Sequence, residues 1–189
     1  MMDKSLPYYR LILKRPAGAP LPERALPKGY TLTPFTDGDE ADWAEIETAV
    51  DEFPRAVDAL RYFQQSYLPA RQEVELRTLF LIAPDGRKVG TVTLWWGYTG
   101  LRRDPWLHWV AVRPELQGQG LGKAMVAQAL RRFLEIEGDR AIYLPTQTWS
   151  YRAVNIYRWA GFDFCYEPGA GGFDNQTQQG LEIIRNRLR

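Results

Sequence analysis

The residues best suited to chemistry form a glycine-rich turn between an apolar stretch and a helix-like stretch. The apolar stretch runs from Leu107 to Val112, and the turn reads Gln117-Gly118-Gln119-Gly120-Leu121-Gly122. Glycines let a backbone approach a ligand closely. The start of a helix adds N–H groups that lack helical acceptors, together with a partial positive charge, and both favour a phosphate group. The turn is therefore a candidate phosphate-binding loop, and the alternative is a turn that only connects two elements.

Two other kinds of phosphate loop do not fit this spacing. A P-loop requires Gly-x-x-x-x-Gly-Lys-Ser/Thr, but Lys123 is followed by Ala124, so the hydroxyl that would hold magnesium is missing. A dinucleotide fingerprint requires Gly-x-Gly-x-x-Gly early in a strand–helix–strand unit, and the glycines at 118, 120 and 122 are spaced differently. An ATP-dependent phosphotransferase is therefore disfavoured.

The chain has one histidine, His108, and one cysteine, Cys165. An imidazole with a reference pKa of about 6.5 suits a general base, and the alternative is a strand histidine packed beside Trp106 and Trp109. Cys165 has no basic neighbour, which favours a buried structural thiol over an acyl-enzyme. A disulfide within the chain is impossible, and we expect no metal site.

Composition narrows the class of protein. The 189 residues fit one domain, and 24 Lys plus Arg against 23 Asp plus Glu leave a net charge of +1. This balance argues against nucleic-acid or membrane binding. The N-terminus has charges too close together for a signal-peptide core, and no apolar run is long enough for a membrane helix. We expect a cytoplasmic protein.

Hydrophobic periodicity gives the elements that must position these residues. Strands are predicted over 30–35, 76–83, 88–98, 107–112, 141–146 and 162–166, and helices over 40–50, 55–65, 120–137 and 150–160. A marginal helix is expected over 181–188, after a glycine-rich loop or poor strand at 168–180. A meander followed by a strand–helix–strand unit predicts an α/β (α+β) fold, with a mixed, mostly antiparallel sheet flanked by helices in a single domain. We expect an N-terminal extension over residues 1–29, which are rich in proline and glycine and include a short strand over 8–13. We expect the functional domain over 30–167 and a C-terminal tail over 168–189.

Two motifs in this order resemble the GNAT acyltransferase superfamily. The turn Gln117–Gly122 matches the family's Arg/Gln-x-x-Gly-x-Gly/Ala loop, and Val110, Ala111 and Val112 match the strand before it. The second signature, Asn-x-x-Ala-x-x-Leu-Tyr-x-x-x-Gly-Phe, is matched by Ala153, Ile156, Tyr157, Gly161 and Phe162. Its asparagine position holds Ser150, while Asn155 lies five residues on. The resemblance covers about residues 30–166.

The resemblance implies acetyl-CoA as the donor. Amides of Gln119, Gly120, Leu121 and Gly122 would hold the pyrophosphate with support from Gln117, and the backbone of Val110 and Val112 would pair with the pantetheine arm. These roles agree with anion binding at a helix start and with strand addition by an amide-rich chain. The remaining expected cofactor-side residues are Ala111, Gly118, Lys123, Ser150 and Asn155.

Because Cys165 is not placed to form an acyl-enzyme, we expect direct acetyl transfer to a primary amine in a ternary complex. Tyr157 would protonate the thiolate leaving group, the alternative for a helical tyrosine being core packing. His108 resembles a strand histidine that relays protons in arylalkylamine members of the family. Glu47 and Glu52 are the other candidate bases.

The acceptor cannot be read from the sequence beyond a small-molecule or peptide amine. Eight acids and no base lie between Asp37 and Glu52, which indicates either a solvated helix face or an entrance that attracts a cationic substrate. A non-catalytic acyl-CoA-binding or regulatory module on the same fold is the alternative function. A homodimer stays open, with the segments at 1–29 and 168–189 as candidate interfaces.

Overall fold

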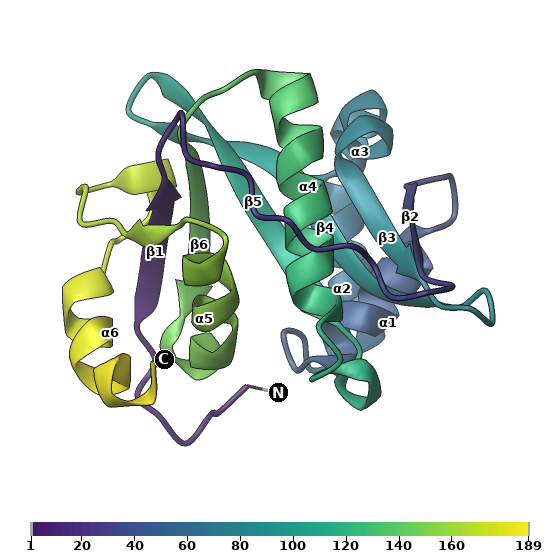
Figure 1. Cartoon of the computed structure of the whole chain (residues 1–189), viewed down its shortest axis with the longest axis horizontal. Helices are drawn as coiled ribbons and strands as arrows, with labels where there is room; N and C mark the ends of the chain where they lie inside the picture. The colour runs from purple at the N-terminus through teal and green to yellow at the C-terminus, as the bar shows by residue number, and fades with distance from the viewer. Residues whose placement is uncertain (1, 189) are drawn as a thin grey trace. The chain divides into compact units, whose positions relative to one another are not determined.

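The computed structural model describes residues 2–188, and its strands form one seven-stranded sheet in the order β2-β3-β4-β5-β6-β1-β7 (Figure 1). The strands are β1 (Arg10–Arg15), β2 (Thr31–Pro34), β3 (Thr78–Ile82), β4 (Lys88–Thr99), β5 (Arg102–Val112), β6 (Ile142–Gln147) and β7 (Asp163–Phe164). The helices are α1 (Glu40–Ala49), α2 (Ala56–Ser66), α3 (Arg71–Arg77), α4 (Leu121–Glu137), α5 (Tyr151–Trp159) and α6 (Thr177–Ile184).

Strand pairing confirms the predicted fold class. The pairs β1·β6, β1·β7, β2·β3 and β3·β4 are antiparallel, whereas β5 and β6 are parallel, with Trp106 opposite Tyr143. The sheet is therefore mixed and mostly antiparallel, and helices flank it. Contacts divide the chain into two compact units.

The first unit contains Arg24–Thr93 and Trp109–Ala129. It holds β2, β3, α1, α2 and α3, the first half of β4, the end of β5 and the first half of α4. Its core is strongly aromatic: the ring of Phe35 stacks on that of Phe63 with centroids 5.6 Å apart, and Trp43 lies 4.9 Å from Phe63. One face of α4 is also buried, because Leu121 and Met125 are at most 1% exposed.

The second unit contains Met2–Glu23, Leu94–His108 and residues 130–188. Its centre is β1, whose residues Leu11, Ile12 and Leu13 are fully buried. The backbone N–H of Ile12 donates to Thr177 Oγ1 at 2.9 Å, which ties α6 against β1, and Figure 1 shows these two elements side by side. Trp106 stacks on Tyr143 at 5.3 Å. The second unit therefore has an aromatic centre of its own.

Most predicted elements are present within a few residues of their expected bounds. The expected short strand at 8–13 is β1, which occupies an interior position of the sheet between β6 and β7. The helix α3 was not predicted, because Thr78 follows it directly and the apolar run at 76–83 obscured the boundary. The last helix begins at Thr177, four residues before its predicted start, where Thr177 is buried and bonded to Asn175.

Candidate functional site

The glycine-rich turn has the backbone conformation that its sequence requires. Gly118 and Gly120 have φ of 81° and 82°, in the left-handed region that favours glycine. The carbonyl of Gly120 accepts the first helical hydrogen bond of α4, from Ala124 N–H at 3.1 Å. The amides of Leu121 and Gly122 therefore precede the first helical hydrogen bond and lie at the positive end of a 17-residue helix. This arrangement can bind an anion.

Gln117 joins the turn to the strand before it. Its side-chain Nε2 donates to the carbonyl of Val112 at 2.8 Å. Gln117, Gly118 and Gln119 are exposed, whereas Leu121 is 1% exposed and anchors the far end of the turn in the core. The Gln117 side chain thus links the predicted turn to the end of the predicted strand.

The backbone of Val110–Val112 lies close to β4 on one side. Arg113 N–H donates to the Val89 carbonyl at 2.8 Å. A Cβ on Gly90 would lie 2.7 Å from the Ala111 carbonyl oxygen, a distance that real Cβ atoms do not reach, so glycine is required there. Val110 is half-buried, and Ala111 and Val112 are 5% and 8% exposed.

Trp109 is a feature of β5 that sequence reasoning did not identify. Its φ is 51°, a left-handed value that is strained for a bulky side chain and interrupts the alternation of the strand. Its indole N–H donates to the Tyr67 hydroxyl at 2.6 Å, and its ring meets Trp43 edge-on at 5.2 Å. Phe53 and Tyr62 lie 5.6 Å and 5.3 Å from it. The strain therefore directs an indole into a cluster of rings contributed by α1, α2 and the segment between them.

Glu47 lies on the same face of α1 as Trp43, one turn later. Its side chain is 1% exposed, and its Oε1 has no hydrogen-bond partner within residues 2–188. Burial raises the pKa of the Glu47 carboxyl well above its usual value, and the nearby negative charge of Glu52 raises it further. Glu47 therefore holds its proton to a higher pH than an exposed glutamate does.

The other acids of the 37–52 segment are mostly paired within the first unit. Lys88 Nζ contacts Asp39 and Asp42, each at 2.6 Å, and Arg113 pairs with Glu45 at 3.0 Å. These ion pairs neutralise much of the charge that the sequence alone presents. A solvated and internally paired helix face accounts for the acidic run, apart from Glu47.

His108 belongs to the second unit, at the end of its part of β5. The side chain is half-buried, and its ring lies 6.1 Å from that of Trp106. Burial lowers the pKa of His108 from 6.5 to about 4. The imidazole is therefore neutral at physiological pH and is a weaker base than its reference pKa suggested.

Tyr157 lies on α5 in the second unit and is 5% exposed, with its ring 6.4 Å from that of Phe162. Ser150 precedes α5, and its Oγ accepts a hydrogen bond from Gln147 Nε2 at 3.3 Å. Asn155, on α5, is half-buried. The predicted residues thus divide into two groups: Val110–Val112, the turn and Lys123 in the first unit, and His108 with the α5 residues in the second.

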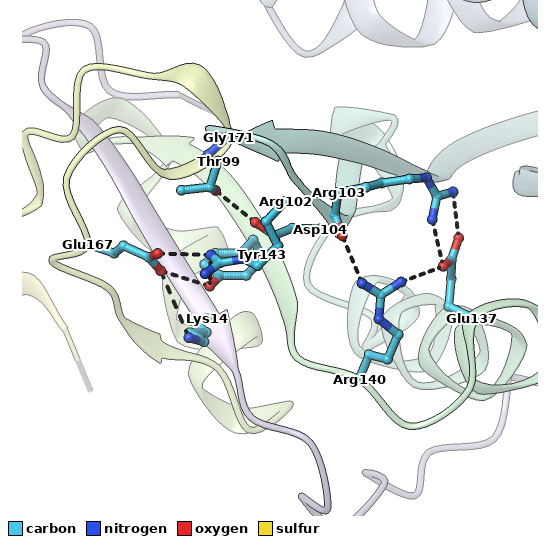
Figure 2. Close-up of polar contacts among 10 residues, drawn as sticks. All are labelled: Lys14, Thr99, Arg102, Arg103, Asp104, Glu137, Arg140, Tyr143, Glu167 and Gly171. Carbon is cyan, nitrogen blue, oxygen red and sulfur yellow. Dashed lines mark hydrogen bonds and ion pairs between the residues drawn. The ribbon is translucent and has the colours of Figure 1, made fainter.

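A polar network that the sequence did not reveal lies elsewhere in the second unit (Figure 2). Arg102 donates to Asp104 at 2.7 Å, to Glu167 at 2.8 Å and to the Tyr143 hydroxyl at 3.0 Å. Thr99 donates to Asp104 at 2.7 Å and accepts from the Gly171 N–H at 3.0 Å. Hydrogen bonds from Arg102 lower the pKa of Glu167. The network ties the end of the β4–β5 hairpin to the segment after β7 and has a structural role.

Cys165 is 7% exposed, and its N–H donates to the Ile12 carbonyl at 2.8 Å. It packs with Trp106 and Tyr143, as a structural cysteine would. No group of His, Cys, Asp and Glu within residues 2–188 is arranged to hold a metal ion. Across the same residues, no helix is both long and apolar enough to cross a membrane.

Similarity to known proteins covers most of the chain. Residues 40–162 match the acetyltransferase (GNAT) family. The chain is 33% identical over 172 residues to a mycothiol acetyltransferase of Pseudarthrobacter chlorophenolicus, with 80% of this chain and 50% of that protein covered. A mycothiol acetyltransferase of Arthrobacter sp. is 31% identical over 166 residues, with 82% and 50% covered. The chain thus spans about half the length of the curated relatives it matches.

Solved structures share the fold. A GCN5-related N-acetyltransferase from Sphaerobacter thermophilus superposes with a TM-score of 0.65 at 25% identity, covering 85% of this chain and 49% of that one. A tandem GNAT protein from the clavulanic acid biosynthesis pathway superposes with a TM-score of 0.60 at 16% identity, covering 86% and 52%. At that identity the second likeness concerns the fold alone.

Proposed function

Because this chain belongs to the GNAT acetyltransferase family, we propose that it transfers an acetyl group from acetyl-CoA to a primary amine. The observation that carries the proposal is the turn at the start of α4, where Gly118 and Gly120 adopt left-handed backbone and the amides of Leu121 and Gly122 precede the first helical hydrogen bond. Such amides suit the pyrophosphate of the donor. Val110 and Val112 offer backbone groups for its amide-rich arm.

In the proposed reaction the amine nitrogen attacks the thioester carbonyl carbon directly. The carbon–sulfur bond breaks as the new carbon–nitrogen bond forms, and the thiolate leaves with a proton from Tyr157. The position of Tyr157 in the second family signature supports this role. A strand amide such as that of Val110 would stabilise the oxyanion. Cys165 has no part in this route, since it packs in an apolar cluster.

The attacking amine must lose its proton to a base. His108 and Glu47 are the candidates, and their electrostatics favour Glu47. A general base works best when its pKa lies near the working pH. Burial lowers the pKa of His108 to about 4 and makes it a weaker base, whereas burial raises the pKa of Glu47 and makes its carboxylate a stronger base. A neutral His108 can still accept a hydrogen bond and orient a substrate or a water molecule.

We assign the acceptor only by its reacting group, a primary amine on a small molecule or a peptide. The relatives named mycothiol acetyltransferase support testing small-molecule amines related to mycothiol first. The aromatic cluster around Trp109 supports an acceptor with apolar carbon next to its amine. The unpartnered, buried Oε1 of Glu47 can accept a hydrogen bond from an amine nitrogen of the acceptor.

An amine panel with a free-thiol readout tests the proposal. The purified chain is incubated with acetyl-CoA and each of a set of mycothiol-related amines, arylalkylamines, polyamines, amino acids and peptide N-termini. We expect thiol release above the amine-free rate for at least one class, accompanied by the acetylated amine in the mass spectrum. Binding of acetyl-CoA without thiol release for any class would instead indicate a non-catalytic acyl-CoA-binding module.

A further inference from the structure

Arg24 lies in a segment that the family match does not cover, since the match begins at residue 40. The segment from Arg24 to Tyr30 leads into β2 and belongs to the first unit, as does the glycine-rich turn. Two features fix its path there. Tyr30 N–H donates to the Pro27 carbonyl at 3.1 Å, and Gly29 packs so tightly that a Cβ would lie 2.9 Å from Pro84. The segment is therefore a packed part of the unit.

The Arg24 guanidinium lies against the glycine-rich turn. Its Nη2 is 2.9 Å from the position that a Cβ on Gly120 would occupy, and the three heavy atoms nearest to that position all belong to the Arg24 guanidinium. Among residues 2–188, a Cβ on Gly118 would meet nothing within 4 Å beyond its chain neighbours. Arg24 thus approaches the turn at Gly120, where the helix begins.

Arg24 also differs from other arginines of its unit. Arg71, Arg77 and Arg113 each pair with a carboxylate of the same unit. Arg24 is exposed, and it makes no hydrogen bond or ion pair within residues 2–188. The N–H donors and the positive charge of Arg24, beside a helix start, are therefore available to bind an anion.

The turn itself supplies little formal charge. Its amides are neutral, and Gln117 is both neutral and bonded to the Val112 carbonyl. A pyrophosphate carries two negative charges, and a helix start contributes only about half of a positive charge. A guanidinium can add a full charge and a bidentate pair of hydrogen bonds, which matches the geometry of phosphate oxygens.

We infer that Arg24 is a binding residue for the pyrophosphate of the acyl-CoA donor, contributed by the segment that precedes the family's own domain. This inference rests on the proposed function, because it takes acetyl-CoA as the ligand of the turn. Lys123, two residues into α4 and half-buried, is the second cation near the same helix start. The assignment concerns Arg24 and the pyrophosphate, and it leaves the 3′-phosphate of CoA to other groups.

Calorimetric titration of the whole chain with CoA and with dephospho-CoA tests this inference. The variants are Arg24→Ala and, as a control that removes one exposed cation from the same segment, Lys28→Ala. We expect Arg24→Ala to weaken both ligands about tenfold at low salt, because a hydrogen bond to a charged group contributes about that much. The deficit should shrink as salt is raised. Lys28→Ala should stay close to the wild-type protein, and Arg24→Lys should recover part of the affinity.

The outcomes separate this inference from the proposed function. Equal CoA affinity for Arg24→Ala and the wild-type protein overturns the role of Arg24 while acetyl-CoA remains the donor. A loss for CoA but not for dephospho-CoA also overturns it, because Arg24 would then contact the 3′-phosphate. If the wild-type protein binds neither ligand, the proposed function itself fails. Unfolding midpoints of the variants, measured alongside, show whether a lost affinity reflects a lost fold.

Discussion

The low pKa of His108 has a measurable consequence for stability. Burial lowers that pKa from 6.5 to about 4, a difference of about 2.5 units. Each pKa unit corresponds to about 1.4 kcal/mol, so this shift can change the free energy of unfolding by up to about 3.5 kcal/mol between high and low pH. His108 is the only histidine in the chain, so no other imidazole contributes.

The sign follows from which state binds more protons. Between about pH 4 and pH 6.5 the unfolded chain protonates His108 while the folded chain does not. Stability therefore increases with pH in this window and levels off above it, and the contribution is lost as the pH falls. At pH 5 the folded protein should have lost about 2 kcal/mol relative to pH 7.5 through this group alone.

Urea unfolding at several pH values between 4.5 and 8 measures this contribution. The perturbation is His108→Gln, which keeps a polar side chain that does not titrate. Glu47 shifts stability in the opposite direction over part of the window, so the quantity to compare is the wild-type free energy of unfolding minus that of the variant. That difference should decrease by about 2 kcal/mol from pH 7.5 to pH 5. A difference that is independent of pH would refute the buried, neutral assignment of His108.

Three further results follow from the same structure. Tyr157→Phe should lower kcat about a hundredfold with little change in the Kd for acetyl-CoA, measured by thiol release and calorimetry, and unaltered turnover would remove the acid role. Because the pKa of Glu47 is raised in the fold, its contribution to the free energy of unfolding should fall as the pH rises above about 4.5, and Glu47→Gln should remove this fall. Urea unfolding from pH 5 to 8 compares the two proteins, and parallel plots of the free energy of unfolding against pH would contradict the prediction. Gly171→Ala should lower the free energy of unfolding, measured in urea, by at least about 2 kcal/mol, because the new Cβ would overlap the ring of Trp106. Gly18 has a similar positive φ but open space around it, so Gly18→Ala should lower the free energy of unfolding only by the backbone strain of about 1 kcal/mol. Equal costs for the two glycine variants would show that the ring gives way.

Local pattern and spacing predicted much of this molecule. The meander, the long helix after the turn and the helix that carries Tyr157 all have clear periodicity or glycine boundaries, so their positions were accessible without a structure. The strand at 8–13 was also visible locally. Its interior place in the sheet was not, because its pairing with β6 joins residues far apart in sequence.

The candidate site was predicted in its motifs but not in its environment. Glu47 was a candidate base from the sequence and stands one turn after Trp43, a spacing that places it on the apolar face. Its burial was not predicted, because it lies in a run of acids. The left-handed backbone conformation of Trp109 could not be predicted, because nothing about a tryptophan side chain favours a positive φ. Arg24 lacked any local signal, since its neighbour in space, Gly120, lies almost a hundred residues away.

Initial velocities of thiol release, with acetyl-CoA and an accepted amine both varied, test the central claim most directly. Direct transfer in a ternary complex predicts saturation in both substrates, intersecting double-reciprocal lines and no burst of thiol before the amine is added. Parallel lines with an amine-independent burst would contradict it by showing an acyl-enzyme. Acetyl-CoA binding with no amine-dependent thiol at all would contradict catalysis itself.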